Sequence, residues 1–202
     1  MKRFCIILLA IFLSSCATPS TPPTATITPT YTPAVTETAS FTLTPACVSP
    51  VPAQSDIDRV LSYTGDVLAS GDWTESHEVL DDRVSVTWQN IPQGAVIFLE
   101  AKIFPCGYEE PDLNQYFNEE YWNVLFQNYE SHELVSQCRS EIGLRLYQFK
   151  ATSQGYEYNI RYWSQSDTDT RVITTMITFP VGAESALDDY SGRLFPKLPN
   201  CS

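Results

Sequence analysis

The sequence predicts an α+β fold, in which a single antiparallel sheet of about six strands packs against helices and follows a disordered Thr/Pro-rich tether. Two observations carry this prediction. Short stretches after residue 80 alternate apolar and polar residues or are continuously apolar, whereas three longer segments have a helical period. The chain has 202 residues, of which 43% are hydrophobic, and this is enough for one domain with a core.

Residues 1–16 have the parts of a secretory signal. Lys2 and Arg3 form a short positive region, Phe4–Leu13 is apolar, and two serines precede Cys16. The apolar run of about ten residues is too short to span a bilayer as a helix. These features predict export from the cytoplasm.

The segment Leu13-Ser14-Ser15-Cys16 resembles the lipobox of bacterial lipoproteins. The resemblance implies cleavage before Cys16, thioether attachment of a diacylglycerol to its sulfur, and usually a third acyl chain on the new amino terminus. Two or more chains give stable membrane anchoring. We therefore expect a signal peptide over residues 1–15 and an extracytoplasmic protein that is lipid-anchored to a bacterial membrane. The alternative is an ordinary signal peptide with a cysteine near its cleavage site.

A lipidated cysteine and tether are expected over residues 16–46. The segment after Cys16 is rich in Thr and Pro, lacks Gly, carries Glu37 as its one charge and has no hydrophobic period. Such a composition cannot bury enough apolar surface to offset the entropy of ordering. Proline and β-branched threonine favour extended conformations, so the stretch is expected to hold a domain away from the membrane, with or without O-glycosylation.

Four cysteines lie in the globular α+β domain expected over residues 47–202. An even number in an exported domain favours two disulfides, and none of the four has the C-x-x-C spacing of a zinc or redox site. Of the possible pairings we expect Cys47–Cys201, because domain termini often lie close together. The second pair is then Cys106–Cys138, which flanks one predicted helix.

Three segments are predicted to be helical. Residues 55–71 have Ser55 as the N-cap, Asp58 at the capping-box position and Gly71 as the C-cap. Residues 112–129 are predicted to form one helix and residues 183–198 the last one. The inward positions are Ile57, Val60, Leu61, Thr64, Val67 and Leu68 in the first helix, Leu113, Phe117, Tyr121, Val124, Leu125 and Asn128 in the second, and Ala186, Leu187, Tyr190 and Leu194 in the third.

The predicted strands follow from the apolar pattern. Residues 84–89 alternate, and residues 95–104 are continuously apolar before Glu100, which is typical of a central strand. Residues 74–80 fit either a strand or a short helix. Four further runs, separated by turn signals, predict an antiparallel meander over residues 133–141, 144–152, 156–163 and 171–179.

The order of these elements resembles two fold families. A meander that ends in a helix resembles the Mog1/PsbP-type sandwich, and Gly71-Asp72-Trp73 after a first helix resembles the NTF2-like cone. The second resemblance implies a pocket for small molecules, although the closing helix and the apolar segment 95–104 depart from the cone pattern. Neither resemblance carries a catalytic residue onto this chain.

Few residues suggest chemistry. His77 and His132 both lie in the string Glu-Ser-His-Glu, but a metal or general-base role would require convergence with carboxylates, and polar positions at loop edges are the simpler interpretation. The run Asp167–Thr170 hints at calcium but lacks the glycine and distal glutamate of an EF-hand, so a polar hairpin tip is expected. We expect no cofactor, no metal site and no catalytic residue.

Aromatic residues crowd two segments, and one helical face cannot bury all of those in the first. Most large aromatic residues are buried in the core, but exposed aromatic faces can bind sugars or proteins. The two sets are Tyr116, Phe117, Tyr121, Trp122, Phe126 and Tyr129, and Tyr156, Tyr158, Tyr162 and Trp163.

The net charge of -12 and the scattered basic residues argue against nucleic-acid binding, which needs clustered Lys and Arg. We expect a membrane-anchored, non-catalytic binding or structural module at the cell envelope, whose partner is an envelope protein, a glycan or a small apolar ligand. A carrier pocket of the NTF2-like type is one alternative. An uncharacterised hydrolase or metal-dependent enzyme is another, for which no P-loop, dinucleotide or G-x-S-x-G motif is found.

Overall fold

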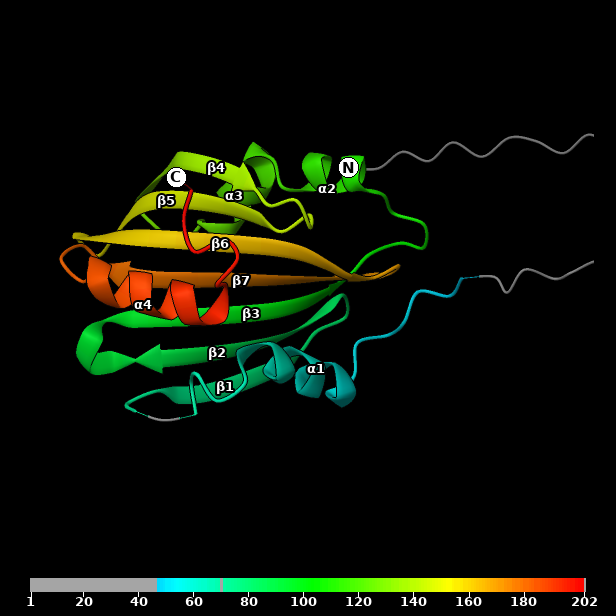
Figure 1. The fold of residues 1–202 in the computed structure, drawn as a ribbon, viewed down its shortest axis with the longest axis horizontal. Coiled ribbons are helices and arrows are strands. Elements are labelled where there is room, and N and C mark those ends of the chain that lie inside the picture. The colour runs from blue at the N-terminus through cyan, green and yellow to red at the C-terminus, as the bar shows by residue number, and fades with distance from the viewer. Residues whose placement is uncertain (1–46, 70, 202) are drawn as a thin grey trace, which may run out of the picture. The chain divides into compact units, whose positions relative to one another are not determined.

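The computed structural model describes residues 47–69 and 71–201, which form one antiparallel sheet packed with helices (Figure 1). The sheet has seven strands in the order β1-β2-β3-β7-β6-β5-β4. The predicted α+β architecture is therefore confirmed. The predictions for the signal peptide, Cys16 and the tether lie outside the described residues.

The elements, in chain order, are α1 (Gln54–Thr64), β1 (Thr74–Val79), β2 (Arg83–Asn90), the 3-10 turn η1 (Ile91–Gln93), β3 (Ala95–Ile103), α2 (Glu110–Tyr116), α3 (Glu119–Leu125), β4 (Ser131–Arg139), β5 (Arg145–Ser153), β6 (Tyr156–Thr168), β7 (Arg171–Pro180) and α4 (Glu184–Leu194).

The segment that fitted either strand or helix is a strand. Thr74–Val79 forms β1, which pairs antiparallel with β2 along its whole length and makes one edge of the sheet. All six of its residues are exposed, so no buried stripe distinguished a strand from a helix in the sequence. The sheet consequently has one more strand than the six that the apolar pattern predicted.

The centre of the sheet is formed by β3 and β7, which are far apart in the sequence. β3 pairs with β2 on one side and with β7 on the other, as its continuous apolar run predicted. β4 to β7 then form the predicted meander, in which each strand pairs antiparallel with the next. The chain crosses from the central β3 to the edge strand β4 through α2 and α3.

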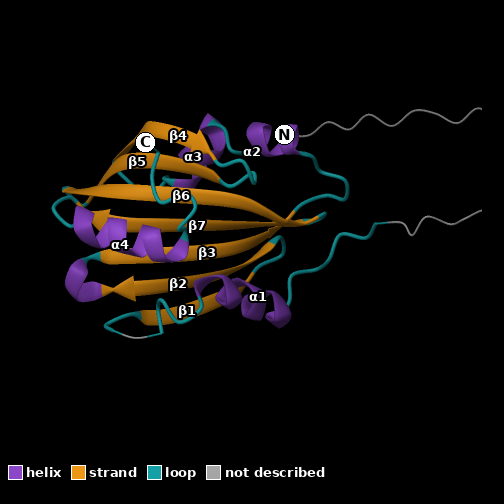
Figure 2. Ribbon diagram, viewed as in Figure 1, coloured by secondary structure: helices purple, strands orange, loops and turns teal. Residues whose placement is uncertain are grey.

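Two apolar cores lie on opposite faces of the sheet, and Figure 2 shows the helices against the strands. On the first, which we call the α1/α4 face, Ile57 of α1 and Leu187 of α4 pack with alternate residues of the strands. On the second, the α2/α3 face, Leu113 and Trp122 cover aromatic residues of β5 and β6. No helix among the described residues is long and apolar enough to cross a membrane.

The first helix begins and ends before the predicted positions. Its N-cap is Ala53, whose backbone N–H donates to Oδ2 of Asp56 at 2.8 Å, so Asp56 and not Asp58 supplies the capping carboxylate. The helix ends at Thr64, because Gly65 adopts a φ of 50°. Leu68 is still buried in the same core, but it reaches that core from the turns after the helix.

The long helix predicted over residues 112–129 is two short helices. Asn118 lies between them, and its side chain caps α3 by accepting from the backbone N–H of Tyr121 at 3.0 Å. The break changes which side chains face inward: Trp122 and Phe126 are buried, whereas Val124, predicted to face inward, is 61% exposed. With the helix broken at Asn118, aromatic residues of both segments are buried on the α2/α3 face.

The predicted disulfide pairing is wrong. The structure joins Cys47 to Cys106, with Cα atoms 5.7 Å apart, and Cys138 to Cys201, with Cα atoms 5.6 Å apart. The sheet order explains the difference. Cys106 follows β3 and Cys138 lies on β4, and three strands separate β3 from β4.

The two observed pairs join neighbours in the tertiary structure. Cys47 precedes α1, which packs against β2 and β3, so it lies near the end of β3 where Cys106 follows. The tail after α4 crosses the α1/α4 face toward the edge strand β4 (Figure 1). It is held there by Trp163, which stacks on Phe195 at 4.3 Å and donates from Nε1 to the backbone oxygen of Leu198 at 2.9 Å.

Candidate functional site

The structure does not bring the two histidines together. His77 lies on β1 and His132 on β4, the opposite edges of the sheet. Six strand spacings separate these edges, on the order of 25–30 Å along the sheet. His132 stacks on Phe126 with ring centroids 4.9 Å apart. Within the described ranges, no group of three or more His, Cys, Asp or Glu side chains could hold a metal ion.

The acidic run at the β6–β7 hairpin has a structural role. Asp167 accepts hydrogen bonds from Arg59 and from the hydroxyl of Tyr63, both on α1, and lies 3.5 Å from Nη1 of Arg171. Burial opposes the charge of Asp167, but the hydrogen bonds from Arg59 and Tyr63 outweigh burial and lower the pKa of the carboxyl. This residue therefore holds α1 against the hairpin.

Most of the aromatic residues belong to the core on the α2/α3 face. Phe117, Trp122 and Phe126 are at most 5% exposed and pack against Tyr147, Phe149 and Tyr162 of the meander. Trp163 is instead buried in the core of the α1/α4 face, and Tyr116 and Tyr156 are 37% and 66% exposed. An extended aromatic binding face is therefore not formed by these two segments.

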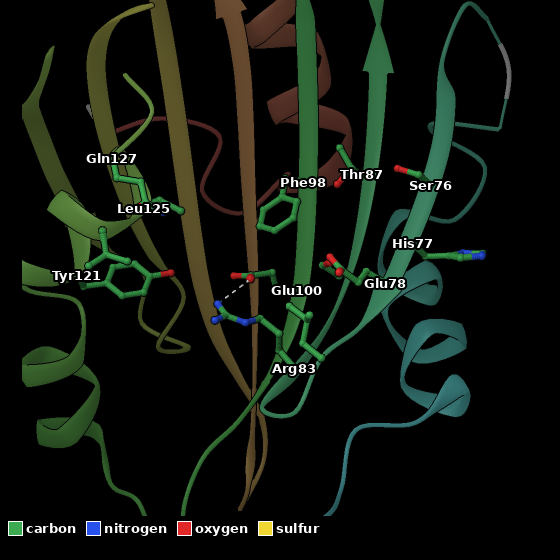
Figure 3. Close-up of a pocket in the computed structure, with 13 residues that line it drawn as sticks. Ser76, His77, Glu78, Arg83, Thr87, Phe98, Glu100, Tyr121, Leu125 and Gln127 are labelled. Atoms are coloured by element: carbon green, nitrogen blue, oxygen red, sulfur yellow. Dashed lines mark hydrogen bonds and ion pairs between the residues drawn. The ribbon is translucent and has the colours of Figure 1, made fainter. Parts of the chain in front are cut away.

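A cleft lies on the α2/α3 face, where the helices leave part of β1, β2 and β3 uncovered (Figure 3). Its volume is about 640 Å³, and α3 forms one wall through Tyr121, Val124 and Leu125. His77 borders the cleft but points away from it. We call this feature the β1–α3 cleft. Its sheet residues are Ser76, Glu78, Arg83, Ser85, Thr87, Phe98 and Glu100.

The strand register explains the polar floor of the cleft. Val84, Val86 and Trp88 of β2 are buried on the α1/α4 face, so the intervening residues must face the cleft. The pairing then places polar side chains of three strands side by side. The two rows are Ser76–Thr87–Phe98 and Glu78–Ser85–Glu100.

A buried charge cluster closes one end of the cleft. The Glu100 carboxylate lies 2.7 Å from Nζ of Lys102, and both side chains are 3% exposed. Nη1 of Arg83 donates to the same carboxylate at 3.1 Å, as Figure 3 shows, and the hydroxyl of Thr174 donates to it at 3.2 Å. Burial lowers the pKa of the Lys102 ammonium, and the neighbouring carboxylate offsets this effect only in part.

Two tyrosines extend this cluster beneath α3. The hydroxyls of Tyr121 and Tyr162 share a hydrogen bond of 2.6 Å. Nζ of Lys102 lies 5.5 Å from the centroid of the Tyr121 ring, within the range of a cation–π contact. Burial raises the pKa of both tyrosines, so both stay neutral at physiological pH.

Within the described part of the chain, hydrogen bonds and ion pairs engage the carboxylate at the end of the cleft but leave hydroxyl groups of its floor unpaired. Both Glu100 oxygens already accept hydrogen bonds or ion pairs from neighbours, so this carboxylate is not free to act as a base. The hydroxyl side chains of the floor are different. Within residues 47–69 and 71–201, no side-chain hydrogen bond engages Ser76 or Thr87, which are accessible to a ligand in the cleft, whereas Ser85 beside them is only 6% exposed.

The cleft was not predicted from the sequence, although the sequence contains one indication of it. Glu100 and Lys102 interrupt the apolar run 95–104, and charged residues in a central strand require buried partners. The partners themselves come from other strands and from α3, so the sequence did not identify them. No protein-family model matches the chain, and the comparison with curated proteins found no match.

Proposed function

We propose that the protein is a lipid-anchored, extracytoplasmic binding module that holds a small ligand, without catalysis, in the β1–α3 cleft. The observation that carries the proposal is the polar floor of the cleft, where side chains of three strands face the solvent-accessible space beside α3. A volume of about 640 Å³ falls within the range of small-molecule sites. The anchor rests on the sequence resemblance around Cys16.

Two disulfides support an extracytoplasmic location, because such bonds persist in oxidising compartments. The charge cluster supports binding over catalysis, since the carboxylate of Glu100 and the ammonium of Lys102 neutralise each other. A carrier for a wholly apolar molecule fits less well. The floor residues Ser76, Thr87 and Glu78 would lose water without gaining a partner from such a ligand.

The anchor is tested by metabolic labelling with radioactive palmitate in a bacterial host that processes lipoproteins. The unmodified chain should incorporate label and partition with membranes. The Cys16→Ser variant should do neither. Labelling of the Cys16→Ser variant, or an unlabelled unmodified chain, would refute the anchor.

The cleft is tested by a thermal-shift screen of the oxidised protein against metabolites, glycans and lipophiles. A ligand at a hundred times its dissociation constant adds about 2.7 kcal/mol, which raises Tm by several degrees. The Thr87→Trp variant fills the floor of the cleft and should abolish the shift. Thr74→Trp, an exposed position on the neighbouring edge strand outside the lining residues, should retain it. A shift that survives Thr87→Trp would place the ligand elsewhere.

A further inference from the structure

We propose that the ligand of the β1–α3 cleft is an uncharged saccharide. This inference rests on the proposed binding function and specifies its ligand class. It is carried by the combination, in one cleft, of free hydroxyl groups, an aromatic ring and an apolar wall, with charges that nearly cancel.

The hydroxyl groups supply the first part of the argument. Ser76 and Thr87 are cross-strand partners, and Ser85 lies in the adjacent row. A hydroxyl both donates and accepts a hydrogen bond, so a row of hydroxyls matches the alternating donors and acceptors of a sugar edge. Leaving such groups unpaired under a bound apolar ligand would be costly, whereas a sugar replaces the water that they lose.

The apolar surfaces supply the second part. Phe98 is half-buried in the row of Ser76 and Thr87, and Val124 of α3 exposes 61% of its surface on the facing wall. A pyranose ring has polar edges and two faces made of C–H groups. An aromatic ring binds such a face because its negative quadrupole attracts the C–H hydrogens. The hydroxyl row and the aromatic ring are adjacent, so one sugar ring can contact both.

The charges supply the third part, because they disfavour anionic ligands. Arg83 is bonded to both Glu100 and Asp82, Lys102 is paired with Glu100, and Glu78 lines the cleft beside Arg83 and Glu100. The cluster is close to neutral, with a slight excess of carboxylate. A phosphate or a polyanion therefore gains little, and the exposed Glu78 carboxylate and Arg83 guanidinium remain able to bind sugar hydroxyls.

The test is a titration of the oxidised full chain, in detergent, with chitotriose, maltotriose and cellotriose, followed by isothermal calorimetry. Dodecanoate and inorganic phosphate are the comparison probes. We expect at least one trisaccharide to bind and the two comparison probes not to bind. Thr87→Val removes one hydroxyl at nearly constant volume and should weaken binding about three- to tenfold, the effect of one neutral hydrogen bond.

Matched variants separate the site from the fold. Thr74→Val makes the same change outside the cleft and should leave the affinity unchanged. Phe98→Tyr keeps the ring and should retain binding, whereas Phe98→Leu keeps the apolar volume without the ring and should weaken binding about three- to tenfold. Unchanged Tm values for Thr87→Val would show that its loss of affinity is not loss of fold.

The outcomes distinguish this inference from the proposed function. Binding of dodecanoate or phosphate in the cleft, with no trisaccharide binding, would overturn the saccharide and leave the binding module intact. Trisaccharide binding that Thr87→Val and Phe98→Leu leave unchanged would overturn the assignment to this cleft. Failure of these probes together with a flat metabolite and lipophile screen would overturn both proposals.

Discussion

The buried carboxylate of Glu100 is expected to be one of the most sensitive single positions for stability. It lies at the end of the β1–α3 cleft with 3% of its side chain exposed, 2.7 Å from Lys102 and 3.1 Å from Arg83. Glu100→Gln keeps the size of the side chain but leaves the Lys102 ammonium buried without a counter-charge. Removing one partner of a buried ion pair costs about 3–5 kcal/mol.

The assay is urea and thermal unfolding of the oxidised protein at pH 7. For a domain of this size, a loss of 1 kcal/mol lowers Tm by about 2–4 °C, so Glu100→Gln should lower Tm by roughly 10 °C. Glu78→Gln is the matched control, because Glu78 lies in the same cross-strand row but is exposed. The control should change stability by less than about 0.5 kcal/mol.

Two further measurements test whether the unpaired Lys102 ammonium causes the lost stability of Glu100→Gln. In the double variant Glu100→Gln/Lys102→Met, no unpaired ammonium remains, and much of the lost stability should return. The pH dependence has a definite sign. Burial lowers the folded-state pKa of Lys102 and Glu100 partly offsets this, so Glu100→Gln lowers that pKa further than in the unmodified protein. Below the unfolded value near 10.4, the unfolded state of the variant therefore binds more protons than its folded state, by a wider margin than in the unmodified protein. The deficit of Glu100→Gln should therefore shrink as the pH rises through this window.

The reasoning would be refuted if Glu100→Gln unfolded within about 0.5 kcal/mol of the unmodified protein. It would be refuted equally if the double variant were no more stable than the single one. Either result would mean that water or a rearranged side chain satisfies Lys102, so the cluster does not depend on this ion pair.

Three other predictions follow from the same structure. Non-reducing peptide mapping should recover a Cys138–Cys201 peptide, whereas a Cys47–Cys201 peptide would contradict the structure. Replacing both Cys138 and Cys201 by Ala should lower the free energy of unfolding by about 4 kcal/mol by the loop-entropy model. Burial raises the pKa of Tyr162, so its contribution to stability should be complete below the unfolded value near pH 10 and be lost as the pH rises above it. Tyr162→Phe should make the alkaline loss, followed by chemical denaturation at pH 8–11, less steep; an unchanged slope would exclude this residue as the cause. Asp167→Asn should destabilise the domain by about 1–3 kcal/mol at pH 7. Because the folded pKa of Asp167 is lowered, the difference should begin to shrink as the pH falls through the unfolded value near 4 and vanish below the folded pKa; a difference that does not shrink on acidification would point to packing instead.

Local patterns in the sequence were sufficient for most of the elements. The alternation of Val84, Val86 and Trp88 predicted a strand with one buried face, and the continuous run 95–104 predicted a central strand. Both are correct because strand burial imposes a period of two or a continuous apolar run directly on neighbouring residues. The meander was predicted for the same reason, since its turns are short and local.

The strand β1 and the helix break at Asn118 could not be predicted from local apolar patterns. β1 has six exposed residues, so its pairing with β2 is the only feature that makes it a strand. The break at Asn118 was missed because the helical pattern continues across it. Two helices in place of one allow Trp122 and Phe126 to be buried against the meander, which only the tertiary structure shows. In both cases the deciding interactions are made with other parts of the chain.

The sequence by itself determined the class of the fold, the number of cysteines available for bonding and the expectation of a lipid anchor, because composition and short-range periodicity carry that information. The tertiary structure decided the cysteine pairing and the site. Cys47 meets Cys106, and Glu100 meets Arg83 and Lys102, through the order of strands in the sheet. That order depends on the sum of many weak contacts between distant segments, so no single stretch of sequence shows it.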